Sequence, residues 1–220
     1  MNYITTKKMS EVDKIVTEEY KITVEQMMEN VGSNIARFIS KLKPKKVTIL
    51  YGKGNNGGDG LSLARHLCIL GFTVEIIPAS DDLNKHAKKQ LEILENMGIE
   101  PTDKIDNKTD IIVDSLLGYN INGNPRNKYG DLIKKANKIK SAKIAIDIPS
   151  GVDPDTGKTY KTFFKTDYTL TLALPKRGMG KTNNFGKLYL VNIGIPKEIY
   201  KELNIDADNY FSGKDVIGIK

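Results

Sequence analysis

The sequence predicts an α/β fold built on a mainly parallel sheet. After two helical segments, short apolar runs of strand length alternate with amphipathic segments of helical period, which is the pattern of strands and helices in a parallel sheet. The first of these runs, residues 47–51, is continuously apolar apart from one threonine, as expected for a strand covered on both faces. Glycine punctuates the pattern, following this run at Gly52 and ending the next helical segment at Gly71.

The first forty residues predict two helices. Met9, Val12 and Val16 recur at helical spacing, and Thr23 with Gln26 forms a capping box at the start of the second helix. The other expected elements are a strand at 47–51, a glycine-rich loop at 52–60, a helix at 61–70, a strand at 72–77, a helix at 84–97, a strand at 111–117, a helix at 128–139, and strands at 143–148, 168–174 and 188–193. Because no repeat or linker interrupts the pattern, we expect one domain over residues 1–220.

Composition narrows the class of protein. With 39% hydrophobic and 28% charged residues, the chain is globular rather than disordered. The net charge of +7 favours an anionic partner such as a nucleotide, or reflects a lysine-rich solvated surface. The only cysteine, Cys68, allows no intrachain disulfide, and neither a signal peptide nor a membrane-spanning apolar run is present. We expect a soluble, cytoplasmic protein.

Three polar, glycine-bearing segments follow predicted strands, at residues 52–60, 113–118 and 146–153. The carboxyl ends of parallel strands share one edge of the sheet, and ligands in open α/β sheets bind outside that edge. We therefore expect the functional site where these three segments meet.

The first segment contains a literal G-x-G-x-x-G in Gly52, Gly54 and Gly57, which fits either a pyrophosphate loop or a plain tight turn. No acidic residue is well placed to bind the ribose of a dinucleotide, because Glu75, the acid at about the right distance along the chain, lies inside its predicted strand. Residues 55–59, Asn-Asn-Gly-Gly-Asp, add side-chain oxygens that could face a ligand or a cation.

Two aspartates, Asp114 and Asp147, lie in otherwise apolar strands. A buried carboxylate must be paired, hydrogen-bonded or bound to a cation, and desolvation raises its pKa toward the range of a general acid or base. Either one alone could simply cap a loop through backbone N–H groups. Both on one edge favour a functional role.

Together the three segments resemble the NAD(P)H-hydrate epimerase family, also called the YjeF N-terminal domain family. The residues that carry the resemblance are 54–60 followed by 64–67, then 113–118 and 147–153, with support from Met28-Glu29-Asn30, from Leu174-Pro175-Lys176 and from 186–196. The resemblance implies a Rossmann-like three-layer α/β/α sandwich, usually a homodimer. It implies an isomerase that interconverts the R and S epimers of hydrated NADH or NADPH and binds a potassium ion.

The resemblance also implies site residues. The substrate contacts would be Asn55, Asn56, Gly57, Gly58, Asp59, Gly118, Tyr119, Asn120, Ile121, Asn122, Gly123, Asn124 and Asp147, and the potassium ligands Asn56, Asp114 and Ser150. Asn120 departs from the glycine more usual in the family, but asparagine tolerates the left-handed conformation.

Epimerisation at the hydroxyl-bearing ring carbon needs a proton donor and a base, because either water leaves and returns or the ring opens and recloses. We expect Asp147 to be the acid/base, with Asp59 as the second candidate. The chain ends at Lys220 without room for a fused dehydratase, which implies a separate dehydratase partner. The alternatives are a noncatalytic dimeric scaffold that binds nucleotide or RNA, and a nicotinamide-dependent dehydrogenase based on the G-x-G-x-x-G match alone.

Overall fold

A seven-stranded sheet, in the order β2-β1-β3-β4-β5-β6-β7, organises the described part of the chain. The computed structural model describes residues 1–120, 123–207 and 210–219. The strands are β1 (Lys46–Tyr51), β2 (Thr73–Pro78), β3 (Ile111–Ser115), β4 (Ala142–Ile146), β5 (Tyr168–Leu172), β6 (Lys187–Val191) and β7 (Val216–Ile219). All neighbouring strands pair in parallel except β6 and β7, which are antiparallel. The prediction of a mainly parallel sheet is confirmed.

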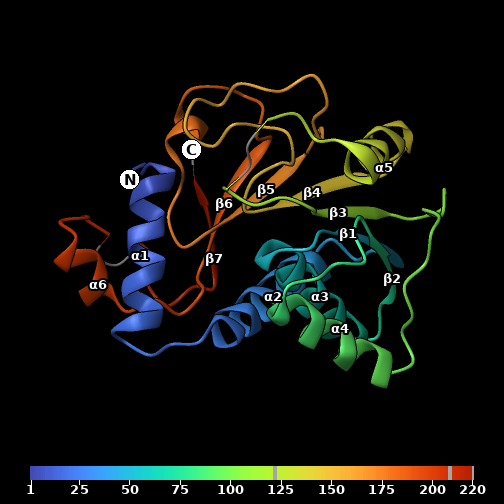
Figure 1. The fold of residues 1–220 in the computed structure, drawn as a ribbon, viewed down its shortest axis with the longest axis horizontal. Coiled ribbons are helices and arrows are strands. Elements are labelled where there is room, and N and C mark those ends of the chain that lie inside the picture. Colours follow the sequence, from blue (N-terminus) through green and yellow to red (C-terminus); the bar gives the residue numbers. More distant parts are fainter. Residues whose placement is uncertain (121–122, 208–209, 220) are drawn as a thin grey trace.

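Helices lie on both faces of the sheet (Figure 1). They are α1 (Thr6–Glu18), α2 (Val24–Ser40), α3 (Asn55–Ile69), α4 (Lys85–Asn96), α5 (Asn127–Lys138) and α6 (Lys197–Glu202), with a short 3-10 segment at Arg177–Gly180. Helices α2, α3 and α4 lie on one side and α5 on the other, while α1 and α6 contact each other at one flank. This is the expected three-layer α/β/α arrangement. None of the described helices is both long and apolar enough to cross a membrane.

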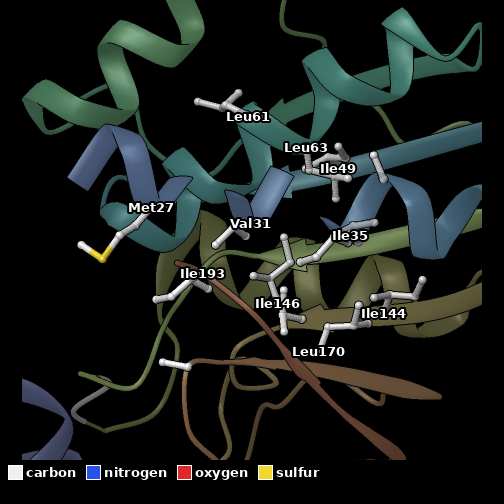
Figure 2. Packing of buried hydrophobic residues seen from close by; sticks show 14 of the residues in the cluster. Met27, Val31, Ile35, Ile49, Leu61, Leu63, Ile144, Ile146, Leu170 and Ile193 are labelled. Carbon is white, nitrogen blue, oxygen red and sulfur yellow. The ribbon is translucent and has the colours of Figure 1, made fainter. Parts of the chain in front are cut away.

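Successive residues of the central strands pack on opposite faces. Ile49 of β1 belongs to a cluster that includes Val31 of α2 and Ile146 of β4, gathered between helices and sheet in Figure 2. The next residue, Leu50, belongs to a second cluster with Ile133 of α5. Because side chains alternate along a strand, a run without polar alternation produces two apolar faces that must both be covered.

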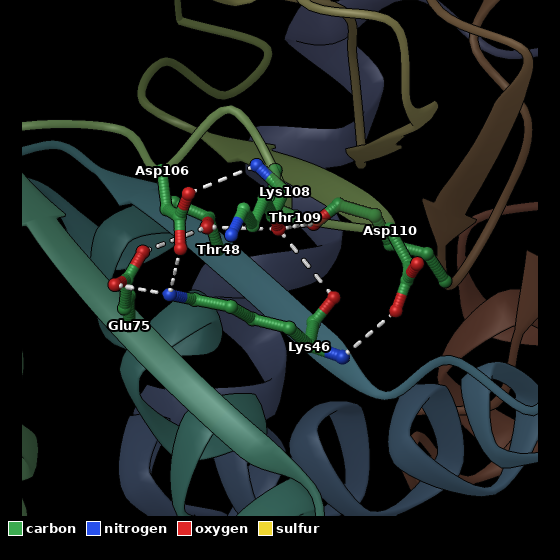
Figure 3. A network of polar contacts seen from close by, with 8 residues as sticks. Lys46, Thr48, Glu75, Asp106, Lys108, Thr109 and Asp110 are labelled. Carbon is green, nitrogen blue, oxygen red and sulfur yellow. Dashed lines mark hydrogen bonds and ion pairs between the residues drawn. The ribbon is translucent and has the colours of Figure 1, made fainter.

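A polar network fastens the amino-terminal edge of the sheet (Figure 3). The Lys46 ammonium lies 2.5 Å from a Glu75 carboxylate oxygen and 2.7 Å from one of Asp106. Beside them, the Thr48 hydroxyl donates to that of Thr109 at 2.9 Å. The network ties the segment before β3 to β1 and β2, so these polar residues have a structural use at the edge opposite the expected site.

The structure corrects the start of one helix and contains short elements that the sequence did not predict. Helix α3 begins at Asn55, so the prediction of a loop through residue 60 is wrong. Glycines have low intrinsic helix propensity, but tight packing against the strands overrides that preference here. Helix α6 and strand β7 were not predicted, because elements of six and four residues are too short to show a period and depend on their partners.

Candidate functional site

Three strand ends meet at the carboxyl edge of the sheet. Tyr51 at the end of β1 lies opposite Ser115 of β3, and Asp114 lies opposite Ala145 of β4. The polar segments after β1, β3 and β4 are therefore brought together, as the sequence predicted.

The glycines after β1 mainly serve close packing. A Cβ atom on Gly52 would lie 1.9 Å from the carbonyl oxygen of Leu116, and one on Gly57 would lie 1.9 Å from that of Gly52. A Cβ on Gly54, the N-cap of α3, would meet nothing within 4 Å. Two of the three glycines thus let the first turn of α3 pack against the strand ends, and only Gly54 faces open space.

Asn56 and Asp59 lie three residues apart in the first turns of α3, and so on one face of that helix. Both side-chain polar atoms of Asn56 are buried without a hydrogen-bond partner among the described residues. The Asp59 side chain makes no hydrogen bond or ion pair within the same part of the chain. Burial raises the pKa of Asp59 well above its usual range, and the carboxylates of Asp147 and Asp13 raise it further. Asp59 therefore holds its proton where an ordinary aspartate would lose it.

Asp114 and Ser150 are hydrogen-bonded to each other next to the turn that follows β3. The Asp114 carboxylate accepts a bond from the Leu116 N–H at 3.1 Å, and the Leu117 N–H donates to the Ser150 hydroxyl at 3.0 Å. Desolvation raises the pKa of Asp114 to about 6, against the opposing effect of its hydrogen bonds. Both side chains are essentially fully buried, so they lie behind the cavity wall and not on its surface.

Asp147 lies directly after β4, so the expectation that it is inside the strand is wrong, and residues of the neighbouring strand β5 hold its side chain. Its Oδ1 lies 2.5 Å from the ammonium of Lys176 and accepts weaker bonds from the Thr171 hydroxyl and the Leu172 N–H, each at 3.3 Å. Its φ of 64° puts it in the left-handed region, which aspartate tolerates better than most residues. The sequence did not predict that Asp147 pairs with buried Lys176. There, Leu174-Pro175-Lys176 only supported the resemblance to the family.

A cavity of about 750 Å³ opens at this edge. Asn56, Asp59 and Asp147 contribute to its lining. Helices α1 and α2 contribute apolar side chains such as Met9 and Met27 together with polar ones. A pocket that combines apolar side chains with a few polar groups is typical of a site for a small organic ligand.

Helix α1 is tied to the loop after β3 by one polar contact. The Tyr119 hydroxyl donates a hydrogen bond to the carboxylate of Asp13. Burial raises the pKa of Asp13, partly opposed by the bond from Tyr119 and by the charge of Lys176. Asp13 lines the cavity, but a single polar residue on an amphipathic helix gave no signal in the sequence.

A sequence model of the family described as YjeF-related protein N-terminus matches residues 24–178. The chain belongs to this family. The match covers α2 to the segment after β5, and so includes the ends of β1, β3, β4 and β5, whereas α1 and Ile193 after β6, which also line the cavity, lie outside it.

Two relatives share 36% identity with the chain and are named NAD(P)H-hydrate epimerase. The one from Rhodopirellula baltica aligns over 92% of the chain and 88% of its own length, and the one from Dehalogenimonas lykanthroporepellens over 90% and 84%. A bifunctional NAD(P)H-hydrate repair enzyme from Archaeoglobus fulgidus is 35% identical over 97% of the chain and 46% of its own length. The crystal structure of the yeast protein ynu0 has the same fold, with a TM-score of 0.88 at 21% identity and full coverage of both chains.

Most of the YjeF-type residues expected at the site line the cavity, namely Asn55, Asn56, Asp59, Gly118, Tyr119, Asn120 and Asp147. Gly57, Gly58, Gly123 and Asn124 lie outside the lining, and Ile121 and Asn122 fall outside the described residues. The side chain of Asn124 instead accepts a bond from the Thr162 N–H at 2.8 Å and so shapes the loop. Of the expected potassium ligands, Asn56 reaches the cavity surface, whereas Asp114 and Ser150 lie behind it.

The dehydrogenase alternative loses its remaining support in the YjeF fold. Glu75, the acid nearest the expected ribose position in the sequence, is engaged by Lys46 at the amino-terminal edge of the sheet. Gly52 and Gly57 are required for packing, so the G-x-G-x-x-G match needs no pyrophosphate to explain it.

Proposed function

We propose that the protein is an NAD(P)H-hydrate epimerase, an isomerase that interconverts the R and S epimers of hydrated NADH and NADPH. The observation that carries the proposal is the pair of carboxyl groups on the cavity wall, Asp59 and Asp147, in opposite electrostatic settings. Asp59 is buried without a partner among the residues that the structure describes, whereas Asp147 is paired with an ammonium. The two most similar relatives described above carry the same activity in their names.

Two carboxyl groups in different settings suit an acid and a base. If the hydroxyl leaves, the Asp59 carboxylic acid would give it a proton so that it departs as water, and Asp147 would take a proton from the water that adds to the other face. If the ring opens instead, Asp59 would protonate the released ring nitrogen while Asp147 takes the hydroxyl proton, and both protons would move back when the ring recloses on the other face. This divides between two residues the acid/base role for which the sequence-based expectation had Asp147 as the first candidate and Asp59 as the second.

We also propose a potassium site at Asn56, Asp114 and Ser150. The residues fit the ion, because amide, carboxylate and hydroxyl oxygens are the donors that hard cations prefer. The side-chain atoms of Asn56 have no partner among the described residues, which is a sign of a buried group that lacks compensation. The buried Asp114 carboxylate accepts hydrogen bonds from Leu116 and Ser150, but no cationic side chain in the described part of the chain compensates its charge. When bound, the ion would supply fixed positive charge beside the substrate. The protein residues would still hold and move the proton.

The test is to incubate a purified single epimer of hydrated NADH or NADPH with the protein and to separate the epimers by chromatography. Equilibration of the two epimers faster than in a protein-free control supports the activity, and an unchanged epimer contradicts it. The Rhodopirellula baltica epimerase serves as the positive control. Replacing potassium by sodium in the same assay should slow the reaction, and equal rates would contradict the ion site.

The epimerase would supply a dehydratase that accepts only one epimer. The bifunctional repair enzyme from Archaeoglobus fulgidus supports this link, since the chain covers only 46% of its length. We propose a dehydratase activity as the functional partner of this chain. Adding a purified dehydratase should let a mixture of epimers react to completion only when this protein is present.

We further propose that the protein acts as a homodimer in the cytoplasm. The family resemblance supports the dimer, and the only cysteine, half-buried Cys68, is compatible with a reducing compartment. Light scattering should give twice the mass of one chain, and cell fractionation should find the protein with cytoplasmic markers.

A further inference from the structure

Lys176 carries a buried ammonium next to the cavity. The residue is 1% exposed and follows the end of β5. Backbone bonds fix its position, because the Ile4 N–H donates to the Pro175 carbonyl at 2.9 Å and the Arg177 N–H donates to the Ile4 carbonyl at 2.8 Å. An extended segment before α1 thus holds Lys176 in place.

The three hydrogens of this ammonium match three acceptors. They are Oδ1 of Asp147 at 2.5 Å, the Leu172 carbonyl at 2.9 Å and the Thr171 hydroxyl at 3.3 Å. An ammonium has three donors and no acceptor, so none is left over for a substrate. Any contribution of Lys176 to the reaction must therefore act through Asp147.

The two oxygens of Asp147 differ. Oδ1 receives Lys176, Thr171 and the Leu172 N–H, whereas Oδ2 has no hydrogen bond within the described residues. Oδ2 lies 3.9 Å from the position that a Cβ atom on Gly118 would take, on the side where the same Cβ would meet Asn56 at 3.4 Å. Both Gly118 and Asn56 line the cavity, so Oδ2 is the oxygen that Asp147 presents to it.

Without the ammonium, Asp147 would be a buried carboxylate held by two bonds of 3.3 Å. Two further carboxyl groups, Asp13 of α1 and Asp59 of α3, are near enough for the charge of Asp147 to raise their pKa. Because an unpaired buried charge is costly, the side chain would turn away or lose its charge.

We propose that Lys176 is a positioning residue for the epimerisation: its ammonium fixes Oδ1 of Asp147 and compensates the charge, which leaves Oδ2 directed at the substrate. This inference rests on the proposed function. It does not require Lys176 to touch the substrate.

The test is a double-mutant cycle with Asp147, measured as kcat and KM separately. Lys176→Met should lower kcat by roughly 100-fold, the range of a lost acid or base, while KM changes less than about threefold. Lys176→Arg, which keeps the charge, should recover part of the lost kcat. Lys187→Met removes an exposed lysine from the start of β6 and should leave both constants unchanged.

The second arm of the cycle separates positioning from direct action. If Lys176 acts only through Asp147, then Asp147→Asn and Asp147→Asn with Lys176→Met should have equal kcat. A further tenfold fall in the double variant would overturn the proposal, as would normal kcat in Lys176→Met. The double variant removes both charges, so it can fold even where Lys176→Met alone does not. If the wild type is inactive where the Rhodopirellula baltica epimerase is active, the proposed function itself fails.

Discussion

Asp114 and Ser150 are joined by two hydrogen bonds that cross between β3 and the loop after β4. The Ser150 N–H donates to Oδ2 of Asp114 and the Ser150 hydroxyl donates to Oδ1, both at 2.7 Å. The same hydroxyl accepts the Leu117 N–H. These hydrogen bonds hold the turn after β3 in place. Gly118, the residue after Leu117, lines the cavity.

Ser150→Ala should destabilise the fold. The substitution leaves a buried carboxylate oxygen and the Leu117 N–H short of partners, at a cost of about 1–3 kcal/mol. Thermal and urea unfolding measure this loss. Ser141→Ala is the matched control, because the buried hydroxyl of Ser141 has no partner among the described residues. Equal stability of the two variants would contradict the stabilising role given to the hydrogen bonds between Asp114 and Ser150.

Gly52→Ala should prevent folding or cost about 3 kcal/mol or more, because the new Cβ would overlap the Leu116 carbonyl oxygen. Gly54→Ala, only two residues away, meets open space and should cost less than about 1 kcal/mol, the difference expected between glycine and alanine at a helix N-cap. Urea unfolding of both variants tests the difference. Similar losses at the two positions would show that local chain flexibility, and not packing, requires these glycines.

Asp59→Asn should lose activity and gain stability at neutral pH. Loss of the acid should reduce kcat by roughly 10²–10⁴-fold. Below about pH 3.9, the usual pKa of an aspartate, the folded and unfolded states are both protonated and the substitution has little effect on stability. Above it, the unfolded state ionises while folded Asp59 keeps its proton, so the wild type loses stability as the pH rises toward the raised folded pKa. The asparagine variant avoids this loss, so its advantage in Tm should grow between pH 4 and pH 7.

Asp110→Asn is the control for Asp59→Asn, because it should change Tm at neutral pH in the opposite direction. The Lys45 and Lys46 N–H groups bond to the Asp110 carboxylate and lower its pKa, so its stabilisation is present at neutral pH and is lost as the pH falls through that lowered value. Asp110→Asn should therefore lower Tm at neutral pH and keep kcat. A lower Tm for Asp59→Asn at pH 7 would contradict the protonated state assigned to Asp59.

Tyr119→Phe should loosen the wall formed by α1. The change removes the hydrogen bond to Asp13 and leaves that buried carboxylate without its phenolic donor. We expect KM to rise several-fold with little change in kcat, and stability to fall by about 1–3 kcal/mol. Tyr20→Phe removes a bond to Glu202 at an exposed position and should change neither quantity. A fall in kcat with KM unchanged would instead place Tyr119 in the chemical step.

The sequence by itself determined the layers and the edge at which the site forms. Apolar runs such as 47–51 predict buried strands because only a sheet covered on both faces gives every residue an apolar environment. The parallel arrangement then places the ends of β1, β3 and β4 together, so Asn56, Asp59 and Asp147 could be named before any coordinates. The capping box of Thr23 and Gln26 was equally readable, because it is local.

Tertiary structure alone decided how these residues are paired and which of them reach the cavity. Lys176 is 29 residues from Asp147, and Asp13 is 106 residues from Tyr119, so no local sequence pattern predicts either contact. The start of α3 at Asn55 likewise depends on how Gly52 and Gly57 pack against distant backbone. Propensity and period report short-range preferences of the chain, whereas burial and charge compensation depend on neighbours that only folding supplies.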